Sequence, residues 1–378
     1  MNRELLDVFG LDPEILHLNH GAFGCAPIPV RREAERWRDR AERNPHQFNG
    51  HQLPGLIAQA RQRAAVFLDT DPAAVGLVRN VSEGVSSVLG SLDLVAGDEI
   101  VVCNHGYGAV TMAARNRVER RGGVIRTASF GLDADDEQIV RAYADECGPR
   151  TRLVIVDQIT SPTAMVLPVA QIAAAVEAPV LADAAHVPGT LPVDIAGLGV
   201  DHWVGNLHKW CYTPRGTALL WTRDDLRDST FPATMNWQLN DGYAASFDYP
   251  GTWDYAGWLA LPAGLDFWTE LGGWEQIERQ STLLSEAQLR LAGRFECSLD
   301  GLPLNPAATM RLIPLPLGIA PSAEAARDLS GTLSDEYGIQ APVNFYHDDA
   351  YLRVAAAPYN TSDDYDRLAD AVLEIAGR

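Results

Sequence analysis

The stretch from residue 181 to residue 221 reads LADAAHVPGTLPVDIAGLGVDHWVGNLHKWCYTPRGTALLW. Asp183 ends a short apolar run that has the character of a buried strand, and His186 follows three residues later. A second short run, at residues 202–205, leads to Lys209 and then to the turn formed by Pro-Arg-Gly. Polar side chains at the ends of buried strands are typical of a binding site in an α/β sheet.

Lys209 lies in an apolar sequence context, although a lone lysine is ordinarily a surface charge. Its near neighbours include Trp203, Leu207, Trp210 and Tyr212. A lysine removed from water has a lowered pKa and can form a Schiff base with an aldehyde. Asp183 has the carboxylate that could pair with a pyridinium nitrogen. The two residues together indicate a lysine that carries a pyridoxal cofactor.

Short apolar runs alternate with helical stretches along most of the chain. The runs occupy residues 75–78, 99–102, 124–127, 153–157, 180–182, 202–205 and 218–221. This alternation predicts an α/β fold with a mostly parallel seven-stranded sheet and helices on both faces. Helical spacing of apolar residues also predicts a helix over residues 28–43.

The pattern changes after about residue 260. Helical stretches at residues 257–271 and 274–295 lead into a region that ends with a strand at 351–356 and a helix at 362–375. We therefore expect a large α/β domain of residues 19–256 that binds the cofactor. Residues 1–18 and 257–378 are expected to form a small α+β domain.

Composition excludes several classes of protein. The formal net charge of −20 opposes binding to nucleic acid or to an anionic membrane. No apolar run is long enough to span a membrane, and the acidic N-terminus is unlike a signal peptide. The five cysteines are scattered, which indicates reduced thiols in the cytoplasm. No metal site is expected, because the pair His17 and His20 lacks a third ligand.

Seven motifs, taken in order and spacing, resemble the class V aminotransferase family of fold-type I pyridoxal 5′-phosphate (PLP) enzymes. Within that family the chain resembles the isopenicillin N epimerase-like branch. The motifs are HLNHGAFG (17–24), RNVSEGV (79–85), NHGYGAV (104–110), DAAH (183–186), GNLHKW (205–210), PGTWD (250–254) and LRVAAAPYNTSDD (352–364). The resemblance covers nearly the whole chain and implies the fold-type I PLP-dependent transferase architecture, with PLP as the cofactor.

The resemblance implies roles around the cofactor ring. Lys209 would carry PLP as a Schiff base, and Asp183 would keep the pyridinium nitrogen protonated, which makes the ring an electron sink. His186 would contact the phenolic oxygen. His105 matches the position that stacks on the pyridine ring, and Tyr107 is a rival for that face.

Other residues would bind the cofactor phosphate. Ser82, Glu83 and Gly84 open a helix after a strand, where backbone N–H groups and the Ser82 hydroxyl form an anion site, although Ser82 could instead be only a helix cap. By resemblance, His208 is a further phosphate contact, and Thr252 reaches the phosphate from the neighbouring subunit. The resemblance therefore implies a homodimer with shared active sites.

The expected substrate is a small molecule, either an amino acid or an amino-acid conjugate. Arg353 matches the arginine that binds the substrate carboxylate, for which a guanidinium is suited. Asn19, His20 and Phe23 lie in a glycine-flanked loop that is expected to edge the substrate pocket, and Tyr359 is a further candidate there.

The common first step is removal of the Cα proton by Lys209, after which several reactions are open. Our preference is carbon–sulfur β-elimination from a cysteine S-conjugate in specialised metabolism such as antibiotic biosynthesis, and it rests on the diversity of the branch. The alternatives are epimerisation with Tyr107, His20 or Tyr359 as a second acid/base, decarboxylation coupled to oxidative deamination, and transamination. A non-catalytic PLP-fold binding protein would be expected to have a damaged lysine site, which is not seen.

Persulfide chemistry is not expected. Cysteine desulfurases of this class carry a nucleophilic cysteine on a loop before the carboxylate-binding arginine. The corresponding residues here, 338–344, read GIQAPVN and contain no cysteine.

Overall fold

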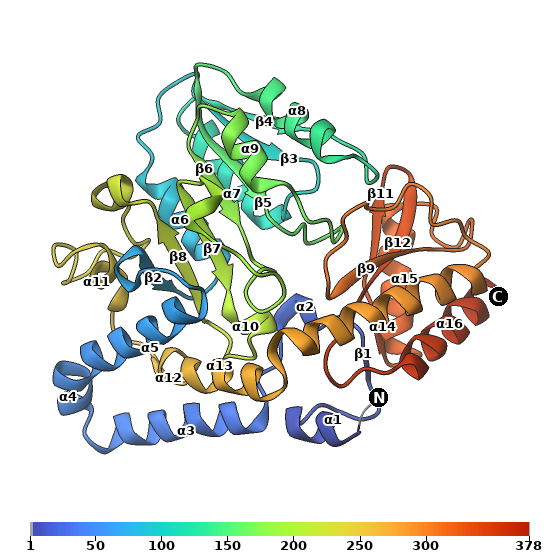
Figure 1. Ribbon diagram of the computed structural model, residues 1–378, viewed down its shortest axis with the longest axis horizontal. Helices are drawn as coiled ribbons and strands as arrows, with labels where there is room; N and C mark the ends of the chain where they lie inside the picture. The colour runs from blue at the N-terminus through green and yellow to red at the C-terminus, as the bar shows by residue number, and fades with distance from the viewer. Residues whose placement is uncertain (1–2, 378) are drawn as a thin grey trace.

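The computed structural model describes residues 3–377 and has a central seven-stranded sheet flanked by helices, with a smaller sheet beside it (Figure 1). The strand order is β2-β8-β7-β6-β5-β3-β4, and only β8 runs antiparallel to its neighbours. The strands are β2 (Val75–Val78), β3 (Glu99–Cys103), β4 (Val124–Ala128), β5 (Thr151–Asp157), β6 (Val180–Asp183), β7 (His202–Asn206) and β8 (Ala218–Thr222). Each contains one of the seven apolar runs, so the predicted mostly parallel α/β sheet is confirmed.

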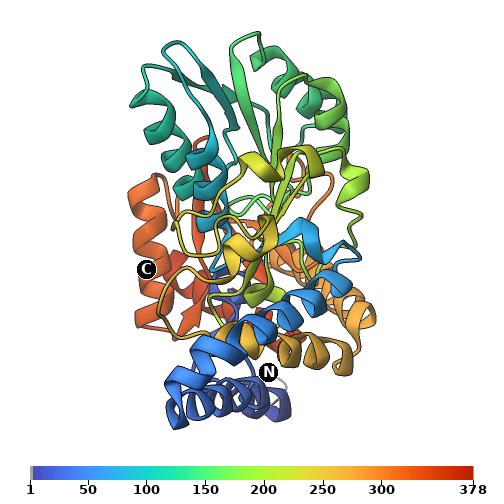
Figure 2. The same cartoon turned by 90° about the vertical axis from the view of Figure 1, so that its left-hand side faces the viewer.

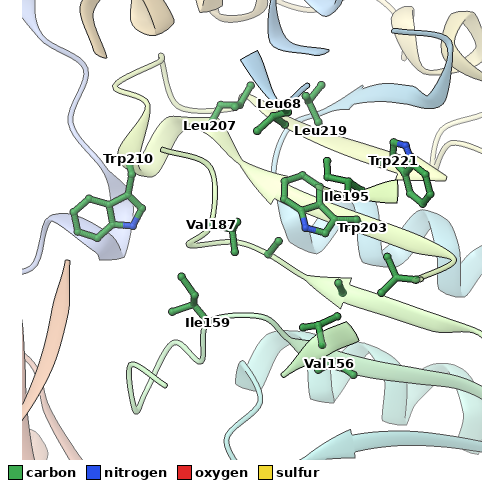
Figure 3. Close-up of a cluster of buried hydrophobic side chains, with 14 of the residues drawn as sticks. Leu68, Val156, Ile159, Val187, Ile195, Trp203, Leu207, Trp210, Leu219 and Trp221 are labelled. Carbon is green, nitrogen blue, oxygen red and sulfur yellow. The ribbon is translucent and has the colours of Figure 1, made fainter. Parts of the chain in front are cut away.

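Helices cover both faces of this sheet because successive strand residues point to opposite sides. In β5, Leu153 and Ile155 pack with α6 (Val81–Ser91) and α7 (Gly108–Glu119). Val154 and Val156 face the opposite side, in a cluster that also includes residues of α5 (Leu53–Phe67), α8 (Asp136–Glu146) and α9 (Val169–Ala175). Figure 3 shows part of that cluster, with Trp203 on the sheet and Trp210 beyond the strand ends. A sheet buried on both faces explains the unbroken apolar runs in the sequence.

The C-terminal part forms a second, antiparallel sheet of order β11-β12-β9. Its strands are β9 (Met310–Pro314), β11 (Val343–Tyr346) and β12 (Asp349–Ala355), and helices α14 (Gly273–Arg294), α15 (Ala323–Asp335) and α16 (Ser362–Ala376) contact this part. The N-terminal strand β1 (Leu16–His17) pairs in parallel with β10 (Ile339–Gln340), and Leu16 and Leu18 enter the same core. We therefore propose the division into residues 19–256 and residues 1–18 with 257–378.

Of the remaining helical segments, the blue N-terminal helices lie at the lower edge of the molecule (Figure 2), whereas α8 and α9 lie beside the upper part of the central sheet (Figure 1). These remaining segments are α1 (Arg3–Phe9), α2 (His20–Phe23), α3 (Ile28–Arg43), α4 (Pro45–Gln47), η1 (Phe48–Gln52), α5 (Leu53–Phe67), η2 (Pro72–Ala74), α8 (Asp136–Glu146), α9 (Val169–Ala175), η3 (Ala196–Leu198), α10 (Leu207–Trp210), η4 (Asp224–Ser229), α11 (Tyr243–Asp248), α12 (Ala256–Leu259) and α13 (Leu261–Glu270). The helix expected over residues 257–271 is broken at Ala260, where Pro262 in the first turn of α13 cannot donate a backbone hydrogen bond. Within residues 3–377, no helix combines the length and apolar character needed to cross a bilayer.

We predict that Gly84→Ala destabilises the fold, because a Cβ at this position would lie 2.5 Å from Cγ2 of Val204 on β7. Overpacking of this kind costs about 1–3 kcal/mol, which exceeds the gain in helix propensity. The midpoint of urea unfolding should fall. Gly90→Ala on the same helix is the control, because a Cβ there meets nothing within 4 Å and should raise the midpoint slightly. Equal stability of the two variants would contradict the close packing of α6 on the sheet.

Candidate active site

A cavity of about 200 Å³ lies at the carboxyl ends of the central strands. It brings together side chains from segments far apart in the sequence. Its lining residues are Ala22, Phe23, Asn80, Val81, Ser82, Tyr107, Asp157, Ile159, Ser161, Asp183, Ala185, His186, Asn206, His208 and Lys209. This is the edge of an α/β sheet where ligands bind.

A larger hollow of about 680 Å³ lies in the C-terminal part and includes Cys297, Pro316 and Asp349. No lysine, arginine or histidine is among its lining residues. The smaller cavity contains the convergent titratable groups that are typical of an active site, so we place the site there.

Lys209 is on the short helix α10, directly after β7. Its Nζ lies 3.1 Å from Nε2 of His186. Burial has the largest effect on the Lys209 amine and lowers its pKa to about 8. The negative charge of Asp183 acts in the opposite direction and raises the pKa. A larger fraction of this amine is therefore neutral at physiological pH than for an exposed lysine, which favours nucleophilic attack on an aldehyde.

Asp183 ends β6 beside Asp157, which ends the neighbouring strand β5 in register with it. Oδ1 of Asp183 accepts a hydrogen bond from the backbone N–H of Ala185 at 3.0 Å. Its Oδ2 is buried and has no hydrogen-bond partner among residues 3–377. An orphaned buried carboxylate oxygen facing this cavity fits the pyridinium N–H of PLP, which would supply the missing donor.

Asp157 was not anticipated from the sequence. It lines the cavity, and its Oδ1 accepts the backbone N–H of Tyr107 at 3.1 Å. Burial and the neighbouring carboxylate of Asp183 raise the pKa of Asp157 well above its usual value. Burial also raises the pKa of Asp183, to about 6. The only sequence signal for Asp157 was an acidic residue at the end of a predicted strand.

His186 is buried between Lys209 and Trp210. The indole N–H of Trp210 donates to Nδ1 of His186 at 3.4 Å. Burial, reinforced by the charge of Lys209, holds the pKa of His186 well below its usual value, so the ring is neutral. With Nδ1 as acceptor, the ring proton lies on Nε2, where it can donate to the amine or to the phenolic oxygen of the cofactor.

The phosphate candidates divide into two groups. Ser82 and His208 line the cavity, and Ser82 is not the helix cap, because the side chain of Asn80 takes that position by accepting the N–H of Glu83. Glu83 forms an ion pair with Arg79 outside the cavity lining. Gly84 also lies outside the lining, where it allows the close packing of α6 on β7.

Asn206 was also missed by the sequence analysis. It lines the cavity, and its Oδ1 accepts the N–H of Val81 at 3.0 Å, which fixes the start of α6 against β7. Thr252 is exposed and does not line the cavity of its own chain.

Of the two aromatic candidates for the ring face, Tyr107 lines the cavity and His105 does not. His105 is fully buried, stacked against Phe130 and Tyr346 at centroid distances of 4.6 Å. Its two ring nitrogens are occupied by Thr163 and by the carbonyl of Phe130. The His105 ring is already packed against Phe130 and Tyr346, so it is not available to stack on the cofactor ring. We therefore propose that Tyr107 stacks there.

Arg353, on β12, adjoins the cavity through Ser161. Its Nη1 donates to the Ser161 carbonyl at 2.5 Å and its Nη2 to Oδ1 of Asn19 at 2.6 Å. Its Nε is buried and has no partner among the described residues. Burial lowers the pKa of Arg353 to about 10, which leaves the guanidinium charged. A buried cation with no carboxylate partner in residues 3–377 fits a site that receives a carboxylate from a substrate.

The other expected substrate contacts differ in position. Phe23 lines the cavity and is 73% exposed. His20 and Tyr359 are buried outside the lining, hydrogen-bonded to each other at 3.0 Å. Nε2 of His20 donates to the carbonyl of Lys209 at 2.8 Å. His20 thus holds the backbone of Lys209, and Tyr359 holds His20. Neither residue lines the cavity, although the sequence analysis expected both at the edge of the substrate pocket.

Two further observations bear on the kind of chemistry. Across residues 3–377, no three His, Cys, Asp or Glu side chains are grouped to hold a metal ion. A partly buried lysine beside a neutral histidine, near an orphaned carboxylate oxygen on a mostly parallel sheet, is the arrangement typical of a fold-type I PLP-dependent enzyme.

Comparison with known proteins gives the family. The model of the family described as aminotransferase class-V matches residues 30–311, and the chain belongs to this family, whose cofactor is PLP. The chain is 30% identical to isopenicillin N epimerase of Amycolatopsis lactamdurans, covering 97% of this chain and 96% of that protein. It is 28% identical to an L-cysteine desulfhydrase of Arabidopsis thaliana, covering 98% and 91%.

The solved structures that match include a complex of the cystine C-S lyase C-DES with its reaction product cysteine persulfide. That structure has a TM-score of 0.79 and 23% sequence identity, and the match covers 95% of this chain and 97% of that one. This likeness confirms the fold predicted from the sequence.

We predict that Asp183→Asn retains PLP but turns over substrate about 100-fold more slowly or worse, because a neutral amide cannot stabilise a protonated pyridinium as the carboxylate does. Bound PLP is measured by absorbance and turnover by product formation. Lys209→Ala is the companion variant, in which borohydride should no longer fix the cofactor to the protein. Turnover near that of the wild type in Asp183→Asn would show that Asp183 is structural.

We predict that Arg353→Ala weakens binding of L-alanine, measured by titrating the absorbance of the holoenzyme, and leaves PLP bound. Loss of a charge-assisted bidentate contact in a desolvated site costs about 2–5 kcal/mol, or roughly 30-fold or more in affinity. Arg353→Lys keeps the charge without the paired N–H groups and should show an intermediate loss. An unchanged affinity in both variants would remove Arg353 from the substrate site.

Proposed function

We propose that this enzyme is a carbon–sulfur lyase that eliminates a thiol from the β-carbon of cysteine or a cysteine S-conjugate. The observation that carries the proposal is that Lys209 lines the cavity, where its amine can act as a base. Two of the three candidates for a second acid/base, His20 and Tyr359, are not among the lining residues. His20 and Tyr359 are hydrogen-bonded to each other behind the Lys209 backbone. The similarity to an L-cysteine desulfhydrase supports the same reaction class.

The residues divide the work as follows. When bound, PLP supplies an aldehyde that condenses with amines and a ring that withdraws electrons from the α-carbon. Arg353 holds the substrate carboxylate, and Asp183 keeps a proton on the ring nitrogen. The neutral amine of Lys209 takes the Cα proton, and the thiolate then leaves from Cβ. His186 holds Lys209 in place through the contact of 3.1 Å.

Epimerisation is the second candidate, favoured by the 30% identity to an isopenicillin N epimerase over nearly the whole chain. It requires a proton donor on the face of the α-carbon opposite Lys209. Tyr107 is the one of the three sequence candidates that lines the cavity. We rank elimination first because it needs no second acid/base. Decarboxylation with oxidative deamination and transamination remain lesser alternatives.

We propose a homodimer in which Thr252 of each chain reaches the phosphate of the other site. The exposure of Thr252 and its absence from the cavity of its own chain support this arrangement. We further place the enzyme in the cytoplasm and in specialised metabolism, such as antibiotic biosynthesis. The free cysteines support the first placement, and the likeness to isopenicillin N epimerases supports the second.

We predict that incubation with S-methyl-L-cysteine in deuterated water releases methanethiol, pyruvate and ammonia. The thiol is measured colorimetrically and the other products by NMR, with Lys209→Ala as the inactive control. Recovery of the intact conjugate as its enantiomer, deuterated at Cα and without thiol release, would reverse the ranking in favour of epimerisation. An aldehyde formed with carbon dioxide and peroxide would instead indicate decarboxylative oxidation.

A further inference from the structure

A buried hydrogen-bond network lies beside the cavity, between the end of β3 and the C-terminal sheet. Its centre is His105, which is fully buried. The hydroxyl of Tyr346, on β11, lies 2.7 Å from Nε2 of His105 and 2.9 Å from the carbonyl oxygen of Phe130. Nδ2 of Asn104 donates to the same hydroxyl oxygen at 2.6 Å. The network therefore joins the central sheet to a strand of the C-terminal sheet.

The hydrogen bonds of this network have one consistent direction. Burial lowers the pKa of His105 to about 4, so the ring is neutral and has one N–H group. Nε2 lies 3.0 Å from the carbonyl of Phe130, which can only accept, so Nε2 carries the proton. Nδ1 then accepts from the hydroxyl of Thr163 at 3.1 Å. The Thr163 oxygen in turn accepts from Thr160 at 2.7 Å.

The same segment holds the substrate-binding arginine. Residues 160–163 follow β5 and include Ser161, which lines the cavity and accepts from Nη1 of Arg353 through its carbonyl. The side-chain amide of Asn344, on β11, donates to the carbonyl of Pro162 at 2.6 Å. The segment is thus fixed by the His105 network on one side and by β11 and β12 on the other. Loss of the His105 contact would remove one of the hydrogen bonds that hold Thr163 and would leave the neighbouring Ser161 carbonyl less firmly placed.

We propose that His105 and Tyr346 are positioning residues that set the Arg353 guanidinium for the substrate carboxylate by fixing residues 160–163. Neither residue touches the cofactor or the substrate, and the aromatic contact with the cofactor ring belongs to Tyr107. This inference rests on the proposed role of Arg353 in binding the substrate carboxylate.

The test compares two amines that differ only in the carboxylate, L-alanine and ethylamine, by titrating the absorbance of the holoenzyme. Tyr346→Phe keeps the ring and removes the hydroxyl. We expect its dissociation constant for L-alanine to rise about 5- to 30-fold, the effect of losing one or two hydrogen bonds at a partly buried hydroxyl. The constant for ethylamine, the PLP affinity and the absorbance maximum of the holoenzyme should match the wild type. His105→Asn should give the same pattern.

Tyr351→Phe is the matched control, because Tyr351 is on the neighbouring strand opposite Asn344 and its hydroxyl makes no hydrogen bond within residues 3–377. It should bind both amines as the wild type does. Unchanged L-alanine affinity in Tyr346→Phe and His105→Asn would overturn the inference, provided that Arg353→Ala weakens it. A shifted holoenzyme spectrum or weaker PLP binding in His105→Asn alone would also overturn it, because that result would place His105 at the cofactor. Unchanged affinity in Arg353→Ala would instead contradict the carboxylate-binding role on which the inference rests.

Discussion

The buried oxygen Oδ2 of Asp183 has no donor among residues 3–377, and the chemistry that we propose for the site depends on it. Burying a carboxylate without a full set of hydrogen bonds costs free energy. The folded protein without cofactor is therefore less stable than it would be with an apolar residue at this position. A protonated ring nitrogen supplies the missing donor and at the same time gains a negative neighbour. In the proposed arrangement, bound PLP would remove the cost of this unpaired oxygen, which favours binding of the cofactor, and the carboxylate would strengthen electron withdrawal by the ring.

The remaining polar groups of the cavity follow from this arrangement. Lys209 is partly buried near Asp183, where loss of solvent lowers the pKa of its amine and the carboxylate limits that decrease. His186 is kept neutral by burial and by the charge of Lys209. Its proton lies on Nε2, because Trp210 occupies the other nitrogen, and Nε2 can donate to the Lys209 amine when that amine is neutral. One hydrogen bond from outside the cavity, the indole N–H of Trp210, fixes the direction of a proton at the reacting lysine.

The substrate side of the site depends on contacts between the two sheets. Arg353 comes from the C-terminal sheet, but the residues that fix its guanidinium, Ser161 and Asn19, come from the loop after β5 and from the N-terminal segment. A movement of the C-terminal sheet would therefore displace the arginine from the lysine. The network around His105 and Tyr346 opposes such a movement, because its hydrogen bonds join a fully buried histidine to a partly buried tyrosine of the C-terminal sheet.

The order of amino acids alone determined the α/β class and the seven strands, and it singled out Lys209 and Asp183 as the candidates on which our proposal for the site rests. Unbroken apolar runs indicate strands that are buried on both faces of a sheet, and polar residues at the strand ends indicate the edge of the sheet where ligands bind. Local patterns could not predict that Asp157 would lie beside Asp183, because that proximity depends on which strands become neighbours. Nor could they separate His105 from Tyr107, two residues apart in one motif. Only the tertiary structure places Tyr346, 241 positions away in sequence, against the His105 ring and so directs it away from the cavity.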